Sequence, residues 1–281
     1  MINLNGTLVN KEKATLSINN RGLAYGDSVF ETIRVINGKI IFWEDHYFRL
    51  MASMRIMRME IPSLFSPEFL EEKILEVIVQ NNFHNAAARI RLTIFRKEGG
   101  YYTPLTREVD YIIEATKLNV SFYLLNTDPY EIELFKDHFI NSGLLSTIKS
   151  NNRAINVLGG IYANENDYNN CLLLNENKMV VEALNGNIFL VKNNVIKTPP
   201  LTDGALNGII RKQLVSIISG MENYNLEEGS ISPFDLQKAD ELFITNVITG
   251  IQPITKYRKK EYTADIARDL LTKLNVKVRL G

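Results

Sequence analysis

Several residues of this sequence stand where their side chains or backbone groups could do chemistry. Lys149 follows the apolar run GLLSTI, and a lysine beside apolar surface can act as a nucleophile. Glu182 follows an apolar stretch at 179–181, so its carboxylate could hold a cationic ring nitrogen. Gly208 and the turn at Asn246 each offer backbone N–H groups that can bind a phosphate. Each also has an ordinary interpretation as a solvated lysine, a charge at a strand end or a plain turn.

Arg49 and His46 lie three residues apart in the segment EDHYFRL. At that spacing two side chains share one face of a helix. The planar guanidinium of Arg49 suits a phosphate, which it can grip with two donors. The ordinary alternative is a surface arginine, and for His46 we favour the interpretation as a packed or hydrogen-bonded structural residue.

Composition excludes several classes of protein. The chain has 281 residues, with 32 basic and 32 acidic side chains, so it lacks the basic excess of a general nucleic-acid or anionic-membrane binder. One cysteine, Cys171, and three scattered histidines give little support to disulfides or to a metal site. We expect no signal peptide and no membrane span, because no apolar stretch approaches about 18 residues. These features favour a cytoplasmic protein.

Strand and helix patterns alternate along the whole chain, which predicts an α/β or α+β fold. A hairpin is expected at 29–42, with its turn at Asn37-Gly38, then a helix capped by Asp45 and a helix opened by Pro67. Strands are expected at 88–95, 111–115, 144–148, 171–174, 180–181, 187–191 and 241–245, and helices at 154–164, 208–218 and 264–274. A polar connection at 119–129 divides the chain into domains at 1–120 and 125–281.

The order of these candidate residues and the sequence motifs around them resemble the class IV (fold-type IV) aminotransferase family, whose members use pyridoxal 5′-phosphate. The resemblance covers nearly the whole chain. It is carried by RGLAYGDSVFETIRVINGKI, EDHYFRLMASM, IKSNNRAIN, VVEALNGNIFLVKNNVIKTPPLTDGALNGIIR and FITNVITGIQPI.

The resemblance implies a role for each candidate. Lys149 would hold the cofactor as an internal aldimine and act as the general acid and base once released. Glu182 would keep the pyridine nitrogen protonated, which makes the ring an electron sink. Leu206 would pack on the ring, and Asn187 and Glu31 would be structural. The groups implied for the phosphate are Arg49 and the backbone around Gly208, Ile209, Ile210, Asn246 and Val247.

The resemblance also implies the architecture of the enzyme. Family members have a smaller amino-terminal and a larger carboxy-terminal domain, with the cofactor in the cleft between them. The usual unit is a homodimer that contributes residues across its interface. The expected partners are therefore small molecules, namely amino-acid and 2-oxo-acid substrates, and no metal is expected.

The branch of the family is left open by the motifs. Phe30 and Arg91 resemble branched-chain transaminases, which act on L-amino acids, although Ala154 stands where those enzymes have a tyrosine. D-amino-acid transaminases have a tyrosine at position 30, and an arginine and a histidine that trap the substrate carboxylate after the central strand. That region here reads RKEGGYYTP and has no histidine, which disfavours the D-specific interpretation. The pair Asn152-Arg153 instead resembles aminodeoxychorismate lyases, which release pyruvate and 4-aminobenzoate. The lyases also favour the NGI motif at 207–209 and the loop pattern TN…GI.P that begins at Thr245. Arg91 or Arg153 would hold a substrate carboxylate in either case, and a non-catalytic cofactor carrier is a remote third interpretation.

Overall fold

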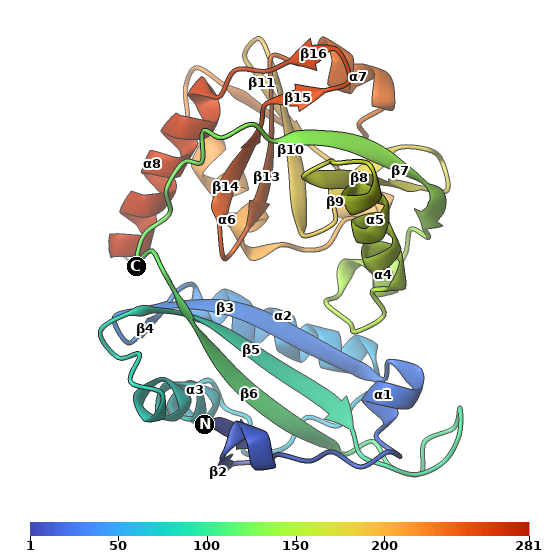
Figure 1. The fold of residues 1–281 in the computed structure, drawn as a ribbon, viewed down its shortest axis with the longest axis vertical. Coiled ribbons are helices and arrows are strands. Elements are labelled where there is room, and N and C mark those ends of the chain that lie inside the picture. The colour runs from blue at the N-terminus through green and yellow to red at the C-terminus, as the bar shows by residue number, and fades with distance from the viewer. Residues whose placement is uncertain (281) are drawn as a thin grey trace. The chain divides into compact units, whose positions relative to one another are not determined.

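The computed structural model describes residues 1–280 and divides the chain into two compact units. The first unit comprises residues 1–122 and 148–152, and the second comprises residues 123–147 and 153–281. Each contains its own sheet, and the predicted mixed α/β class is confirmed. Figure 1 shows the elements of both.

The first unit is built on a six-stranded sheet with the order β2-β1-β6-β5-β3-β4. Two longer helices cover one face of it. Its elements are β1 (Ile2–Leu4), β2 (Thr7–Val9), a 3-10 turn (Lys11–Lys13), α1 (Arg21–Tyr25), β3 (Ser28–Ile36), β4 (Lys39–Ile40), α2 (Trp43–Ile56), α3 (Pro67–Gln80), β5 (Ala87–Arg96) and β6 (Val109–Leu118).

Alternation along β3 sorts its side chains between two faces. Val29, Ile33 and Val35 enter the core with apolar residues of α2 and α3. Glu31 has the same parity and therefore points toward α2. Phe30 points to the opposite face, where it neighbours the outward residues of β5.

Residues 148–152 extend this sheet along the free part of β3. The Phe30 N–H donates to the carbonyl of Lys149 at 2.8 Å, and the Asn151 N–H donates to the carbonyl of Ser28 at 3.1 Å. Ser150 thereby lies opposite Val29 in an antiparallel bridge. This register puts the Lys149 side chain on the Phe30 face of the sheet.

The second unit contains a larger sheet in which β10 also pairs with β13. Its helices are α4 (Leu144–Thr147), α5 (Ala154–Glu165), α6 (Ile209–Ile218), α7 (Pro233–Lys238) and α8 (Asp265–Leu280), with a 3-10 turn at Leu201–Asp203. Its strands are β7 (Glu131–Ile140), β8 (Asn170–Asn175), β9 (Val180–Ala183), β10 (Gly186–Lys192), β11 (Val195–Thr198), β12 (Asn225–Glu228), β13 (Glu241–Asn246), β14 (Gly250–Ile254), β15 (Lys256–Tyr257) and β16 (Lys260–Glu261).

Two local predictions are wrong. The segment 144–148 was expected to be a strand, but residues Leu144–Thr147 form the short helix α4, because four apolar or small residues fit either period. Asp45 was expected to cap α2, but Phe42 is the N-cap, with a φ of 55° and no side-chain hydrogen bond. Asp45 lies inside the first turn instead, where its charge suits the helix dipole.

No helix within residues 1–280 is both long and apolar enough to cross a membrane.

Candidate active site

Lys149 lies against an aromatic ring that it shares with a second cation. Its Nζ is 4.5 Å from the centroid of the Phe30 ring, and the guanidinium carbon of Arg91 is 3.9 Å from the same centroid. The two cations are therefore no farther apart than the sum of these two distances. Burial is the main cause that lowers the pKa of Arg91, and the neighbouring charge of Arg89 adds to it.

A chain of hydrogen bonds holds Arg91 and the lysine segment together. Arg91 Nη2 donates to Asn151 Oδ1 at 2.9 Å, and Asn151 Nδ2 donates to Ser28 Oγ at 2.6 Å. Asn151 and Lys149 have the same parity in the segment, so both side chains lie on the Phe30 face. Lys149 is thus held on the Phe30 face of the sheet by a segment that is hydrogen-bonded to β3.

Arg49 lies on the opposite face of β3, in a network with Glu31 and His46. Arg49 donates from Nε to Glu31 Oε1 at 2.8 Å and from Nη2 to Glu31 Oε2 at 2.5 Å. His46 Nδ1 lies 2.7 Å from the same Oε2. The predicted sharing of one helix face by His46 and Arg49 is confirmed, and so is the structural interpretation of His46, which is fully buried.

The charge states within this network follow from the balance of burial and pairing. Burial raises the pKa of Glu31, but the charge of Arg49 and the hydrogen bonds from Arg49 and His46 outweigh burial and lower that pKa to about 2. Burial lowers the pKa of His46 by more than Glu31 raises it. At neutral pH the network therefore holds a carboxylate, a guanidinium and a neutral imidazole that donates from Nδ1.

In the second unit, three strands bring the predicted cofactor residue Glu182 into one row with Asn187 and Thr245. Glu182 of β9 lies opposite Asn187 of β10, and Asn187 lies opposite Thr245 of β13. Glu182 is 4% exposed, so it is not the surface charge that its position alone favours. The Leu206 N–H donates to Glu182 Oε2 at 3.0 Å, and Asn187 Nδ2 donates to the Leu206 carbonyl at 2.8 Å.

Helix α6 begins beside this row without a side-chain cap. Its N-cap is Gly208, so no side chain occupies the N–H groups of Ile209 and Ile210. A Cβ at position 208 would lie 1.9 Å from Asn187 Oδ1. Any larger residue there would have to displace the Asn187 side chain, whereas glycine leaves the helix N-terminus open for an anion.

The turn after β13 supplies a second set of backbone donors. Asn246 Oδ1 accepts from the N–H groups of Ile248 and Thr249, at 2.9 and 3.0 Å. The Val247 N–H has no acceptor within residues 1–280, and the Tyr123 hydroxyl fixes the turn by donating to the Val247 carbonyl at 2.9 Å. The turn therefore presents the Val247 N–H, which is one of the two predicted backbone donors.

The donor set of the second unit fits a phosphorylated ring with a protonated nitrogen. A buried carboxylate, an uncapped helix N-terminus and a rigid turn lie at neighbouring strand ends. Thr245 Oγ1 in the same row is buried and has no hydrogen-bond partner within residues 1–280, so the row also contains an unused polar atom.

The remaining candidates have simpler positions. Arg153 is the half-buried N-cap residue of α5. Arg96, the last residue of β5, is 5% exposed. Within residues 1–280 no group of three His, Cys, Asp or Glu side chains could hold a metal ion.

Sequence reasoning missed Asn151, Ser28 and Tyr123 as positioning residues. Their contacts join strands and loops that are far apart in the chain, so the spacing of residues along the sequence does not indicate them. Glu31 did carry a signal, because a carboxylate within a fully buried strand needs a charged partner.

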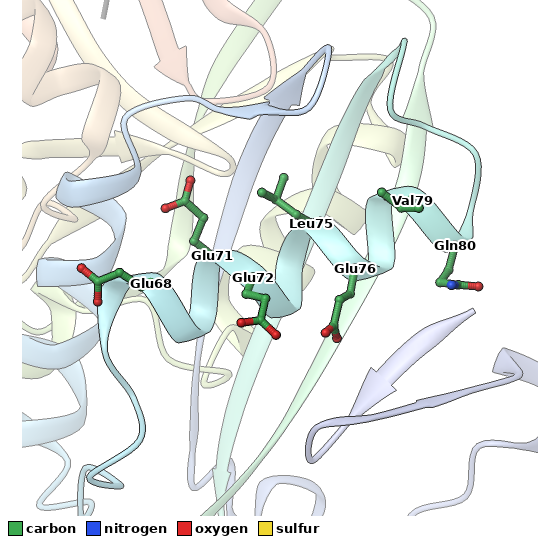
Figure 2. Close-up of a pocket in the computed structure, with 7 residues that line it drawn as sticks. All are labelled: Glu68, Glu71, Glu72, Leu75, Glu76, Val79 and Gln80. Carbon is green, nitrogen blue, oxygen red and sulfur yellow. The ribbon is translucent and has the colours of Figure 1, made fainter.

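A hollow of about 490 Å³ lies along α3, away from the residues described above (Figure 2). It contains no predicted site residue, and its whole lining comes from this one helix. The lining residues are Glu68, Glu71, Glu72, Leu75, Glu76, Val79 and Gln80.

Comparisons with known proteins agree with this arrangement. The sequence model of the family "Amino-transferase class IV" matches residues 28–257. A Methanocaldococcus jannaschii protein whose name proposes a branched-chain-amino-acid aminotransferase is 32% identical over 90% of this chain and 86% of its own length. A D-alanine aminotransferase of Listeria monocytogenes is 27% identical over 90% of this chain and 86% of its own.

A solved structure of a branched-chain aminotransferase has the same fold. The branched-chain amino acid aminotransferase of T.th., complexed with N-(5′-phosphopyridoxyl)-L-glutamate, superposes with a TM-score of 0.88. It is 26% identical, and the match covers 99% of this chain and 94% of that one. The predictions of fold-type IV and of an enzyme that depends on pyridoxal phosphate are thereby confirmed, and the chain belongs to the class IV aminotransferase family.

Proposed function

We propose that this enzyme transfers an amino group between an L-amino acid and a 2-oxo acid, with Lys149 as the residue that carries the cofactor. The branched-chain amino acids are the proposed donors. The similarity to the M. jannaschii protein supports this choice, as do Phe30 and Arg91 at the places where branched-chain enzymes have them.

The single observation that carries the proposal is the pair of cations on the Phe30 ring. An amino acid presents an amine and a carboxylate only two bonds apart. Lys149 is the amine that the substrate amine replaces, and Arg91 stands on the same ring as a carboxylate partner. The side chains of Phe30 and Arg91 therefore orient the substrate at the lysine.

The other predicted site residues would bind the charged groups of the cofactor and move the proton that the reaction transfers. When bound, pyridoxal phosphate supplies an electron sink for the electron pair left on the substrate carbon. Glu182, buried and fixed by the Leu206 N–H, would keep a proton at the ring nitrogen. The N–H groups of Ile209, Ile210 and Val247 would bind the phosphate, and Arg49 would add its charge. Lys149, once released, would move a proton at the substrate carbon.

The test is an absorbance spectrum of the purified protein before and after it receives single amino acids without an acceptor. We expect a cofactor band that L-leucine, L-isoleucine or L-valine converts to that of pyridoxamine 5′-phosphate, with release of the matching 2-oxo acid. Lys149→Ala should lose this conversion. A band that responds to D-alanine and not to the L-amino acids would contradict the proposed donor class.

Aminodeoxychorismate lyase is the second candidate, favoured by the pair Asn152-Arg153 and by the motifs around Gly208 and Asn246. A cofactor band that no amino acid shifts, together with pyruvate release from aminodeoxychorismate, would select the lyase. Loss of the band altogether would contradict both candidates.

We also propose that the enzyme works as a homodimer through α5. The apolar residues Val157, Leu158 and Ile161 are 60, 42 and 50% exposed at positions i, i+1 and i+4 of this helix. Leu144 and Leu145 of α4 are exposed as well. An outward apolar stripe on a helix is typical of a surface that a partner covers. The cytoplasmic location stays a prediction.

A further inference from the structure

A cavity of about 260 Å³ lies within the first unit, and none of its lining residues is assigned above to the cofactor or the substrate. The lining comes from α1 and the turn that follows it, the end of α2, the end of β5 with the loop after it, and Asn152. Its walls carry charged and aromatic side chains, which are Arg21, Asp27, Arg96, Tyr25 and Tyr102.

Two buried guanidinium groups share a single carboxylate oxygen at this cavity. Arg21 Nε and Arg96 Nε both donate to Asp27 Oδ2, at 2.9 and 2.8 Å. Arg21 is 3% and Arg96 is 5% exposed. The cluster therefore carries one positive charge in excess, and a buried charge is stabilised by an opposite charge that pairs with it.

The donors of the two arginines differ in what they contact. Arg96 donates from Nη1 and Nη2 to the carbonyls of Arg58 and Met57. Arg21 Nη1 donates to three successive carbonyls of the loop at 99–101, at 3.1, 3.2 and 2.7 Å. Arg21 Nη2 has no acceptor within residues 1–280, so it is the donor that a molecule in the cavity can use.

Aromatic rings stand beside this donor. The rings of Tyr25 and Tyr102 are 5.8 Å apart at 55°, and the Arg21 guanidinium carbon is 4.9 Å from the Tyr25 centroid. Tyr102 is 92% exposed although Arg21 fixes the loop that carries it. Rings at the mouth of a cationic cavity favour a flat anion with an apolar body.

We propose that this cavity binds a small aromatic monocarboxylate, whose carboxylate pairs with Arg21 and whose ring packs against Tyr25 and Tyr102. The single negative charge would match the single excess positive charge. The volume lies below the usual range for drug-sized ligands, which limits the ligand to about the size of one substituted ring. The site is independent of the proposed transaminase reaction.

The experiment is a calorimetric titration of benzoate into the purified, cofactor-loaded enzyme, with benzamide as the uncharged control of the same shape. We expect one benzoate per chain and no benzamide binding. Tyr102→Ala should weaken the affinity about three- to tenfold. Tyr101→Ala is the matched control, because Tyr101 is 83% exposed on the same loop but does not line the cavity, and it should leave the affinity unchanged.

Two further variants locate the binding. Arg21→Gln should weaken benzoate by at least about tenfold, since it removes a charge-assisted hydrogen bond. Arg91→Gln should leave the affinity unchanged, because Arg91 belongs to the proposed substrate site. Absence of benzoate binding, equal binding of benzamide, equal losses in the two tyrosine variants, or loss in Arg91→Gln would each overturn the proposal. If Arg21→Gln does not fold, the comparison of the two tyrosine variants decides.

Discussion

The carboxylate of Glu31 accepts two hydrogen bonds from the guanidinium of Arg49, from Nε at 2.8 Å and from Nη2 at 2.5 Å. This pair of parallel hydrogen bonds fixes the plane of the Arg49 guanidinium. It also compensates the negative charge of Glu31, which lies in the buried strand β3. Under the proposed function, Arg49 contacts the cofactor phosphate only with donors that Glu31 leaves available. Glu31 is then a positioning residue that acts through Arg49.

Replacing Glu31 should therefore weaken cofactor binding more than it slows turnover of the bound enzyme. We expect Glu31→Gln to lower the affinity for pyridoxal 5′-phosphate about 10- to 100-fold, the range for losing charge-assisted hydrogen bonds. Fluorescence titration of the cofactor-free protein measures this directly. Glu114→Gln is the matched control, because Glu114 is a glutamate of the same sheet whose ion pair with Lys11 lies at the surface. Equal affinity in the two variants would show that Glu31 does not position Arg49.

The same pair makes the free energy of unfolding depend on pH in the acid range. The pKa of Glu31 lies at about 2, below its ordinary value of 4.5. Its stabilising contribution is therefore complete above pH 4.5 and is lost as the pH falls toward 2. His46 acts in the same direction, because a buried imidazole with a lowered pKa resists the proton that the unfolded chain binds below about pH 6.5.

Urea unfolding between pH 7 and pH 3, at fixed protein and cofactor concentrations, measures this effect. We expect the wild-type free energy of unfolding to fall steeply below pH 4.5, and the Glu31 shift to account for roughly 2 kcal/mol of the loss between pH 7 and pH 3. The Glu31→Gln protein should start lower at pH 7 and decline less. Parallel curves for the two proteins would mean that another carboxylate controls acid unfolding.

Phe30 should affect substrate binding and turnover separately, because its ring contacts both Arg91 and Lys149. We expect Phe30→Leu to lower kcat/KM for the amino donor about 3- to 30-fold, the range of two partly buried cation–π contacts. Loss of the Arg91 contact should raise KM, and loss of the Lys149 contact should lower kcat. Phe30→Tyr keeps the ring and should retain most of the activity. Similar kinetics for the leucine and tyrosine variants would contradict a role for the ring.

The sequence predicted the parts of the site that depend on local pattern. The uncapped start of α6 and the Asn246 turn follow from glycine and asparagine chemistry within a few residues, and the structure contains both. The hairpin of β3 and β4 also lies where the Asn37-Gly38 turn predicts it. Local rules succeed here because the relevant hydrogen bonds are local.

Contacts between distant segments could not be predicted in this way. The Asn151 bonds to Ser28 and Arg91 depend on residues 148–152 joining the edge of β3, more than a hundred residues away in the chain. The burial of Arg96 depends on its pairing with Asp27, which no periodicity reveals. At Phe42, the surrounding fold sets a left-handed backbone conformation that its side chain disfavours, against the expected cap at Asp45.

The exposed stripe on α5 should be needed for assembly. We expect Ile161→Asp to convert a dimer into a monomer, because a carboxylate on an interface of this kind would be buried without a partner. Light scattering coupled to gel filtration measures the mass. Gln237→Glu adds the same charge at an exposed position of α7, away from the α5 stripe, and should stay dimeric. A monomeric wild-type enzyme, or a dimer that Ile161→Asp leaves intact, would contradict the proposed interface.

Asn187 and Gly208 should be coupled, because the amide oxygen of Asn187 fills the space that a Cβ at position 208 would need. The backbone at Gly208, with φ −73° and ψ 139°, suits any residue, so the conflict is steric and involves this one side chain. Gly208→Ala alone should displace Asn187, disturb its bond to the Leu206 carbonyl and lower cofactor affinity. Asn187→Ala alone should also lower the affinity, because Leu206 loses the bond that holds it against Glu182. The double variant has room for the added methyl group. Its loss of cofactor-binding free energy should therefore be smaller than the sum of the losses in the two single variants, by about 1 kcal/mol or more. Cofactor titrations of the four proteins complete the cycle, and strictly additive losses would show that the two residues act independently.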